Sequence, residues 1–168
     1  MSAINNHNSE FKGKRVLVTG ATKGLGWVCA QYFEQCGAQL IVTGRTSEKL
    51  KELINGFSEP NNHFSVACDL LEKSGVDDLV SQVKSFCGDI DIVIHALGGG
   101  YGFRDPLLSW EQFDMLHRVN VAAGAEINRQ FIPSMQTRRE GRIVHICSVA
   151  SQEATGSVGY NTAKAAFA

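Results

Sequence analysis

Short apolar runs alternate with longer helical patterns along the chain from about residue 11 onward. The runs are rich in Val and Ile and lack a clean two-residue period, which is typical of strands covered by helices on both faces. They predict five strands, at residues 15–19, 39–43, 63–68, 90–95 and 142–147.

The segments between these runs carry apolar residues at steps of three, four and seven, the spacing of one helical stripe. The first stripe is Leu25, Val28, Cys29, Tyr32, Phe33 and Cys36, and the second is Val76, Leu79, Val80, Val83 and Phe86. Gly37 and Gly88 follow them as helix stops. Ser109 and Gln112 predict a capping box, which opens a helix carrying Trp110, Phe113 and Leu116. A further helix is expected at about 120–138, with a kink or break at Pro133.

Alternating strands and helices predict a parallel sheet with helices on both faces and right-handed crossovers. The sequence shows no internal repeat, low-complexity tract or linker. We therefore expect an α/β fold, a doubly wound parallel sheet of about five strands, over residues 11–168. Residues 1–10 are expected to form a mobile tail.

The composition indicates a globular protein with 43% hydrophobic and 20% charged residues. A net charge of -1 gives no reason to expect a nucleic-acid or membrane partner. Residues 1–9 lack the features of a secretory signal, and no apolar run reaches membrane-spanning length. The five scattered cysteines predict small buried thiols rather than a metal site, and with the lack of a signal they indicate a cytoplasmic protein.

Candidate chemistry lies near the end of the chain, where Tyr160 and Lys164 stand four residues apart and Ser148 precedes the tyrosine by twelve. Residues four apart share one helix face. An ammonium held near a phenol favours its ionised form, so Tyr160 is a candidate proton donor or acceptor for a carbonyl or alcohol. The Ser148 hydroxyl, just past a predicted strand, could hydrogen-bond the same substrate oxygen.

A second motif lies at the first strand–helix turn, where Gly20, Gly24 and Gly26 follow Thr19. Glycines in such a turn let backbone N–H groups approach a pyrophosphate at the helix N-terminus. The spacing G-x-x-x-G-x-G differs from the general G-x-G-x-x-G fingerprint. Its position after a strand still favours nucleotide binding over a purely structural turn.

Together these motifs resemble those of the classical short-chain dehydrogenase/reductase family. The resemblance implies a Rossmann-like sheet with strand order 3-2-1-4-5. The matching residues, from about residue 11 to the end, are Thr19, Gly20, Gly24, Gly26, Asp69, Asn120, Ser148, Tyr160 and Lys164. The resemblance implies that Tyr160 is the acid/base and that Lys164 binds the nicotinamide ribose and promotes ionisation of the tyrosine. It also implies that Ser148 orients the substrate oxygen and that Asn120 holds a relay water.

The resemblance further implies a cofactor site in which the glycines hold the phosphates and Asp69 contacts the adenine. The full expected cofactor-binding set is Thr19, Gly20, Lys23, Gly24, Leu25, Gly26, Arg45, Asp69, Leu70, Ala96, Gly98, Tyr160 and Lys164. Residues 42–46 carry no carboxylate for a ribose 2′-hydroxyl, whereas Arg45 and Lys23 offer positive charge for a 2′-phosphate. These features favour NADP(H) over NAD(H).

Two features depart from the family pattern. His95-Ala96-Leu97-Gly98 replaces the usual Asn-Asn-Ala-Gly, and His95 is expected to be a packed histidine that could take over a hydrogen bond. Family members run to roughly 250 residues, so we interpret this chain as a fragment. Its fifth strand is then expected to form an exposed apolar edge that favours pairing with another chain.

The sequence predicts an NADP(H)-dependent oxidoreductase that interconverts a small ketone and a secondary alcohol, and that is a homodimer or homotetramer at full length. Four alternatives stay open. The chain could be a non-catalytic nucleotide-binding or dimerising module, or Gly156-Ser157-Val158-Gly159 could be a hydrolase nucleophile elbow. Asp69 could instead begin a capping box with Glu72, and Asn120 could bind only backbone groups.

Overall fold

The computed structural model of this chain describes residues 9–166 and residue 168. Most of the predicted mobile tail, residues 1–10, therefore lies outside the described residues. Ser9 and Glu10 are described, and both are exposed in a turn that leads into the first strand.

The fold is built on one parallel five-stranded sheet with strand order β3-β2-β1-β4-β5, which confirms the predicted topology. The strands are β1 Arg15–Thr19, β2 Gln39–Gly44, β3 Phe64–Ala67, β4 Ile92–His95 and β5 Arg142–His145. At its carboxyl end, Thr19 of β1 is level with Thr43 on one side and His95 on the other. The strand ends therefore meet at one edge of the sheet, where an open α/β sheet binds its ligands.

Within the described residues, six α-helices connect or follow these strands: α1 Gly24–Gln35, α2 Ser47–Asn55, α3 Lys73–Cys87, α4 Trp110–His117, α5 Ala123–Arg138 and α6 Val158–Ala165. The predicted capping box is present, because Ser109 Oγ accepts from the Gln112 N–H at 3.3 Å and Gln112 Oε1 accepts from the Ser109 N–H at 2.9 Å. Sequence reasoning missed α2, whose Leu50 and Leu53 are buried.

Of the kink or break expected at Pro133, a break is not found, because α5 continues through this residue. A proline removes one N–H donor but does not by itself end a helix that packing holds in place. The irregularity lies earlier, where residues Arg118–Ala122 form a π-helical turn between α4 and α5. Asn120 lies in the middle of this turn. Such turns often occur at functional sites.

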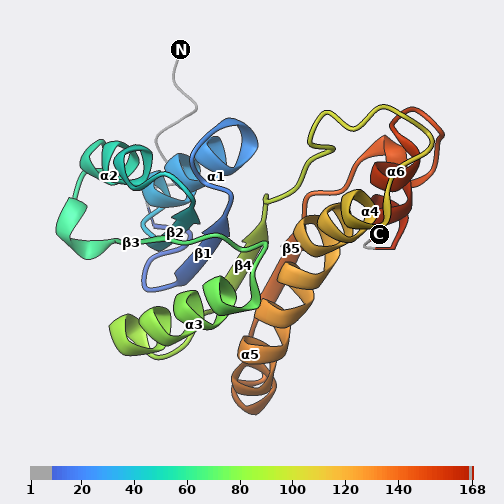
Figure 1. The fold of residues 1–168 in the computed structure, drawn as a ribbon. Helices are drawn as coiled ribbons and strands as arrows, with labels where there is room; N and C mark the ends of the chain where they lie inside the picture. Colours follow the sequence, from blue (N-terminus) through green and yellow to red (C-terminus); the bar gives the residue numbers. More distant parts are fainter. Residues whose placement is uncertain (1–8, 167) are drawn as a thin grey trace.

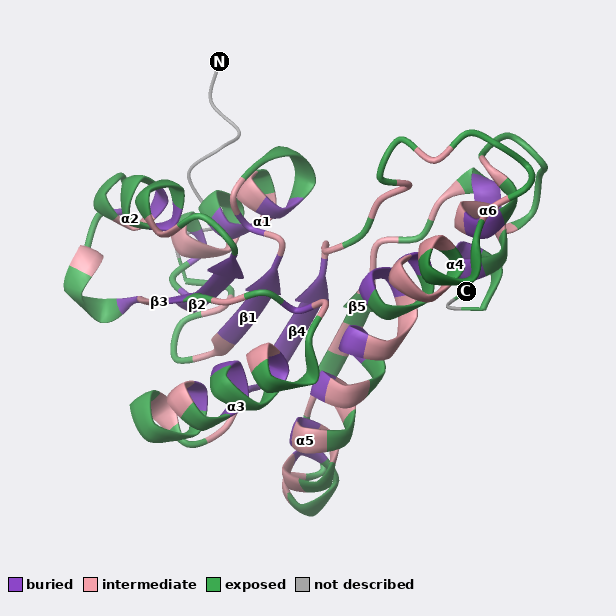
Figure 2. Cartoon of the chain, in the orientation of Figure 1, coloured by how far each residue is buried: buried purple, intermediate pink, exposed green. Residues whose placement is uncertain are grey.

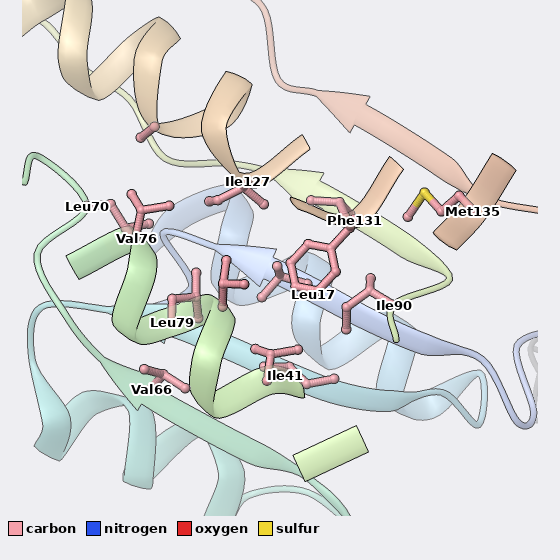
Figure 3. Packing of buried hydrophobic residues seen from close by; sticks show 14 residues of the cluster. Leu17, Ile41, Val66, Leu70, Val76, Leu79, Ile90, Ile127, Phe131 and Met135 are labelled. Atoms are coloured by element: carbon pink, nitrogen blue, oxygen red, sulfur yellow. The ribbon is translucent and has the colours of Figure 1, made fainter. Parts of the chain in front are cut away.

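Helices cover both faces of the sheet, as predicted for a doubly wound fold (Figure 1). An apolar cluster packs on each face. On one face Leu17 and Ile41 pack against residues of α3 and α5, including Phe131 (Figure 3). On the other face Val16, Val18, Leu40 and Val42 pack against α1 and α2. The central strands are consequently buried on both faces, as Figure 2 shows for β1 and β4.

The edge strand β5 is more exposed than the central strands, as predicted, and Val144 is 43% exposed. The expectation that all five cysteines are small buried thiols is wrong for Cys147, which is exposed just past the end of β5. The other four are buried or half-buried. Within the part of the chain that the structure describes, no helix is long and apolar enough to cross a membrane.

Candidate functional site

A cavity of about 480 Å³ opens at the carboxyl edge of the sheet, above the ends of β1, β2, β3 and β4. Its lining includes most of the expected cofactor-binding residues: Gly20, Lys23, Gly24, Leu25, Gly26, Arg45, Asp69, Leu70, Ala96 and Gly98. Residues far apart in the sequence are thus brought to one site. Thr19, Tyr160 and Lys164 are not among the lining residues.

The glycine loop fits closely against its neighbours. A Cβ on Gly26 would lie 2.4 Å from the Gly20 carbonyl oxygen, and a Cβ on Gly20 would lie 2.9 Å from the Leu97 backbone nitrogen. Gly24 adopts φ +57°, a conformation that favours glycine, and no atom lies within 4 Å of where its Cβ would be. The loop therefore leaves free space directly in front of the N-terminus of α1.

Thr19 is fully buried at the end of β1, beneath this loop. Its Oγ1 accepts a hydrogen bond from the Leu97 N–H at 3.3 Å. This bond ties the end of β1 to the segment after β4. Thr19 is therefore placed to position the cavity wall rather than to line it.

Two cations and one carboxylate lie on the cavity wall. Lys23 and Arg45 are exposed side chains at the ends of the first loop and of β2. Asp69 follows β3, and its Oδ1 accepts from the Leu71 N–H at 3.1 Å, which closes an Asx turn. The alternative capping box is wrong, because α3 begins at Lys73 and its N-cap, Glu72, accepts no side-chain capping bond.

Asn120 is buried, with 2% of its surface exposed, and its amide is held by backbone groups. Nδ2 donates to the Gly99 carbonyl at 3.0 Å and to the Leu116 carbonyl at 2.9 Å. Oδ1 accepts from the Gly99 N–H at 3.1 Å. Asn120 thus fixes the loop after β4, as the backbone-binding alternative expects.

Lys164 is a buried lysine with 6% of its surface exposed. Its Nζ donates to the Ile146 carbonyl at 2.9 Å and lies 5.9 Å from the centroid of the Tyr160 ring. Burial lowers the pKa of Lys164 below the usual value for a lysine. A Cβ on Gly98 would lie 3.2 Å from Nζ and 2.8 Å from Asn120 Oδ1, so these three residues meet at one corner.

Ser148 lies just past β5, where its Oγ accepts from the Ala150 N–H at 3.2 Å. Tyr160 is half-buried on α6 and lines a second cavity of about 460 Å³. A Cβ on Gly100 would lie 3.8 Å from the Tyr160 Cβ, so the loop after β4 packs directly on the tyrosine.

His95 is packed in the core, as expected, with 4% of its surface exposed. Its Nε2 lies 2.8 Å from Asn128 Oδ1, and its ring stacks on that of His145 with centroids 4.6 Å apart. The histidine therefore takes over a hydrogen bond at the end of β4. Burial lowers the pKa of His95 to about 4, with the nearby His145 adding to this effect.

Several lining residues were not expected from the sequence: Thr22, Gly44, Cys68, Leu71, Leu97, Gly99 and Val119. Tyr101 also lines this cavity. Gly44, Cys68 and Leu97 could have been expected to line the cavity, because each lies at or next to the end of a predicted strand. The tight fit of Gly44 against Thr22, at 2.6 Å from a would-be Cβ to Cγ2, could not be inferred from the sequence.

The nucleophile-elbow alternative is wrong. An elbow places its serine at a sharp turn between a strand and a helix. Here Ser157 is the N-cap of α6, and the residues before it form the short 3₁₀ turn Val149–Ser151 and a loop. The Ser157 hydroxyl is buried.

Comparison with known proteins agrees with this geometry. An uncharacterized oxidoreductase of Staphylococcus epidermidis is 29% identical over 160 residues, covering 95% of this chain and 69% of that protein. Gluconate 5-dehydrogenase of Gluconobacter oxydans is 35% identical over 160 residues, covering 91% and 60%. L-sorbose reductase from Gluconobacter frateurii, solved in complex with NADPH and L-sorbose, superposes with a TM-score of 0.85 at 28% identity, covering 93% and 60%.

The chain therefore spans 60–69% of the length of these relatives. Its residues 14–168 match the family described as short chain dehydrogenase. The sheet order, the glycine loop and this match lead to one conclusion: the chain belongs to the short chain dehydrogenase family of oxidoreductases.

Proposed function

We propose that this chain carries the cofactor site and the proton-transfer residues of an NADP(H)-dependent oxidoreductase that interconverts a carbonyl and a secondary alcohol. The observation that supports this most strongly is the buried Lys164 ammonium, 5.9 Å from the Tyr160 ring and adjacent to Gly98 in the cofactor cavity. It joins a candidate acid/base to a candidate dinucleotide site.

The shape of the cavity suits a dinucleotide. The space in front of Gly24 and the N-terminus of α1 would accept a pyrophosphate, because unpaired N–H groups and the helix dipole favour negative charge there. Arg45 and Lys23 would hold a 2′-phosphate. L-sorbose reductase, which is similar to this chain, was solved with NADPH.

The reaction chemistry divides between the cofactor and the chain. A nicotinamide bound in the cavity would supply or accept a hydride. The Tyr160 hydroxyl would give a proton to the substrate oxygen or take one from it, and the Lys164 ammonium would stabilise the charge that develops on the phenol oxygen. Ser148 accepts its own hydrogen bond from a backbone N–H, so its O–H is available to the substrate oxygen.

The separation of Tyr160 from the cofactor cavity favours a second candidate function, a nucleotide-binding module without turnover. Tyr160→Phe distinguishes the two. We expect this variant of the enzyme at its natural length to lose about 100-fold or more in turnover of ketones, because it cannot move the proton, while its dissociation constant for NADPH stays unchanged. Rates follow from NADPH absorbance and affinity from calorimetry.

Tyr32→Phe on α1 is the matched control, because it removes the same hydroxyl far from the site and should keep full activity. Equal turnover by the Tyr160→Phe variant and the unmodified enzyme would remove the tyrosine from the mechanism. NADPH binding with no turnover in the unmodified enzyme would instead support the non-catalytic module.

A further inference from the structure

The second cavity lies beside Tyr160 and is lined by the loop that follows β4 and the turn that precedes α6. We propose that it binds a negatively charged group of the substrate, a carboxylate in particular, and that Arg104 recognises this group. The inference rests on the proposed function, because it treats the space next to the Tyr160 ring as the substrate site.

The cavity is built from two segments far apart in the sequence. The loop contributes Gly100, Gly102, Phe103 and Arg104, and the turn contributes Thr155, Gly156 and Ser157, with Tyr160 on α6 between them. Gly100 packs against the tyrosine, as its would-be Cβ lies 3.8 Å from the Tyr160 Cβ. A molecule held here would contact the tyrosine and Arg104 together.

Arg104 is the one charged side chain on the described lining of this cavity. Within the described part of the chain it makes no ion pair or hydrogen bond, whereas Arg15, Arg118, Arg129 and Arg138 each pair with a carboxylate. A guanidinium is a planar fork that binds carboxylates through two hydrogen bonds. The N–H donors of Arg104 therefore stay available to a ligand.

The turn before α6 adds Thr155 to the same wall. Thr155 is exposed, and its hydroxyl can donate a hydrogen bond to a carboxylate.

The charges around the second cavity favour a negatively charged ligand. The described lining includes no Asp or Glu, and the cavity lies at the N-terminus of α6, where the helix dipole favours negative charge. A ketone that carries a carboxylate would pair with Arg104, whereas a neutral ketone would leave this guanidinium without a partner.

The test uses pyruvate, acetoacetate and levulinate, which place the carboxylate one, two and three bonds from the carbonyl carbon, and the methyl ester of each. Binding to the NADPH-loaded enzyme at its natural length is measured by calorimetry, and turnover is measured separately. We expect at least one acid to bind about tenfold more tightly than its ester. Arg104→Gln should abolish this difference by weakening the acid alone.

Arg104→Lys should keep part of the preference, because charge remains without the planar fork. The control is Arg139→Gln, which replaces an exposed arginine at the C-terminal end of α5. It should leave the binding of acids and esters unchanged. Equal binding of acids and esters, no binding of any acid, or insensitivity to Arg104→Gln would overturn the inference even if turnover is normal. Arg104-dependent binding of an acid without turnover would instead contradict the proposed function and leave the anion site standing.

Discussion

At the scale of single residues, the stacked pair of His95 and His145 joins the ends of β4 and β5. Asn128 on α5 lies within hydrogen-bonding distance of both rings, at 2.8 Å from His95 Nε2 and 3.4 Å from His145 Nε2. Ile146, which follows His145, donates its N–H to the His95 carbonyl. The Ile146 carbonyl in turn accepts a hydrogen bond from Lys164 Nζ. The two histidines therefore support the carbonyl that holds the lysine.

This burial makes the stability of the protein depend on pH. The pKa of His95 is about 4 in the folded protein, against the ordinary value of 6.5 that is expected in the unfolded chain. Between pH 4 and pH 6.5 the unfolded chain therefore binds more protons than the folded protein. Stability should therefore fall as pH decreases through this window. We expect His95 to account for about 2 kcal/mol of lost unfolding free energy between pH 7 and pH 5.

Urea unfolding at both pH values tests this expectation. The His95→Gln variant keeps a donor for Asn128 but has no group there that can be protonated. Between pH 7 and pH 5 it should therefore lose about 2 kcal/mol less unfolding free energy than the unmodified protein. His117→Gln, which changes an exposed histidine on α4, serves as the control. An identical pH dependence in His95→Gln would show that His95 is not buried in its neutral form.

At the scale of the elements, the turn from β1 into α1 depends on glycine at position 26. A Cβ there would lie 2.4 Å from the Gly20 carbonyl oxygen, too close for any real contact. Gly26→Ala should therefore displace the loop, lower the unfolding free energy by about 1–3 kcal/mol and weaken NADPH binding. Calorimetry and urea unfolding measure the two effects.

Gly56→Ala is the matched control, because its Cβ would meet only ordinary contacts of 3.4 Å or more at a φ of -80°. It should leave cofactor binding unchanged and stability equal or slightly higher. Similar behaviour of the two variants would contradict the proposed role of the glycine loop.

Predictability varied between elements for physical reasons. Helices α1 and α3 carry long apolar stripes that end at glycines, and their extents follow from this pattern. Helix α2 is short and mostly polar, with few buried positions, so the pattern was too weak to find it. The π-helical turn at Asn120 coincides with hydrogen bonds between Asn120 and the loop after β4, and no local pattern encodes these long-range contacts.

At the scale of the whole molecule, the parallel sheet could be predicted because short strands alternate with helices, and its strand order followed from the family resemblance. The position of the cavity at the carboxyl edge also followed, because strand ends meet there. The second cavity did not, since Arg104 and Ser157 come together only through the packing of a loop on α6. The exposure of Cys147 was missed because its apolar neighbours lie on an edge strand.

The edge itself leads to a prediction about association. β5 has one unpaired side in the described structure, and Val144 is 43% exposed on it. We expect the 168-residue chain to self-associate at high concentration through this edge, and Val144→Lys to reduce association, because a charged edge residue disfavours strand pairing. Light scattering measures the effect.

Val149→Lys is the control, since Val149 is 69% exposed but lies outside the strand. If both lysine variants reduce association equally, general charge rather than strand pairing is responsible.

The most direct test of the account is a calorimetric titration of the protein at its natural length with NADPH and with NADH. We expect NADPH to bind more tightly than NADH. It also predicts that Arg45→Ala weakens NADPH by about tenfold while leaving NADH unchanged, because Arg45 would pair with the 2′-phosphate alone. If neither nucleotide binds, the cavity at the carboxyl edge is not a cofactor site and the proposed function is wrong.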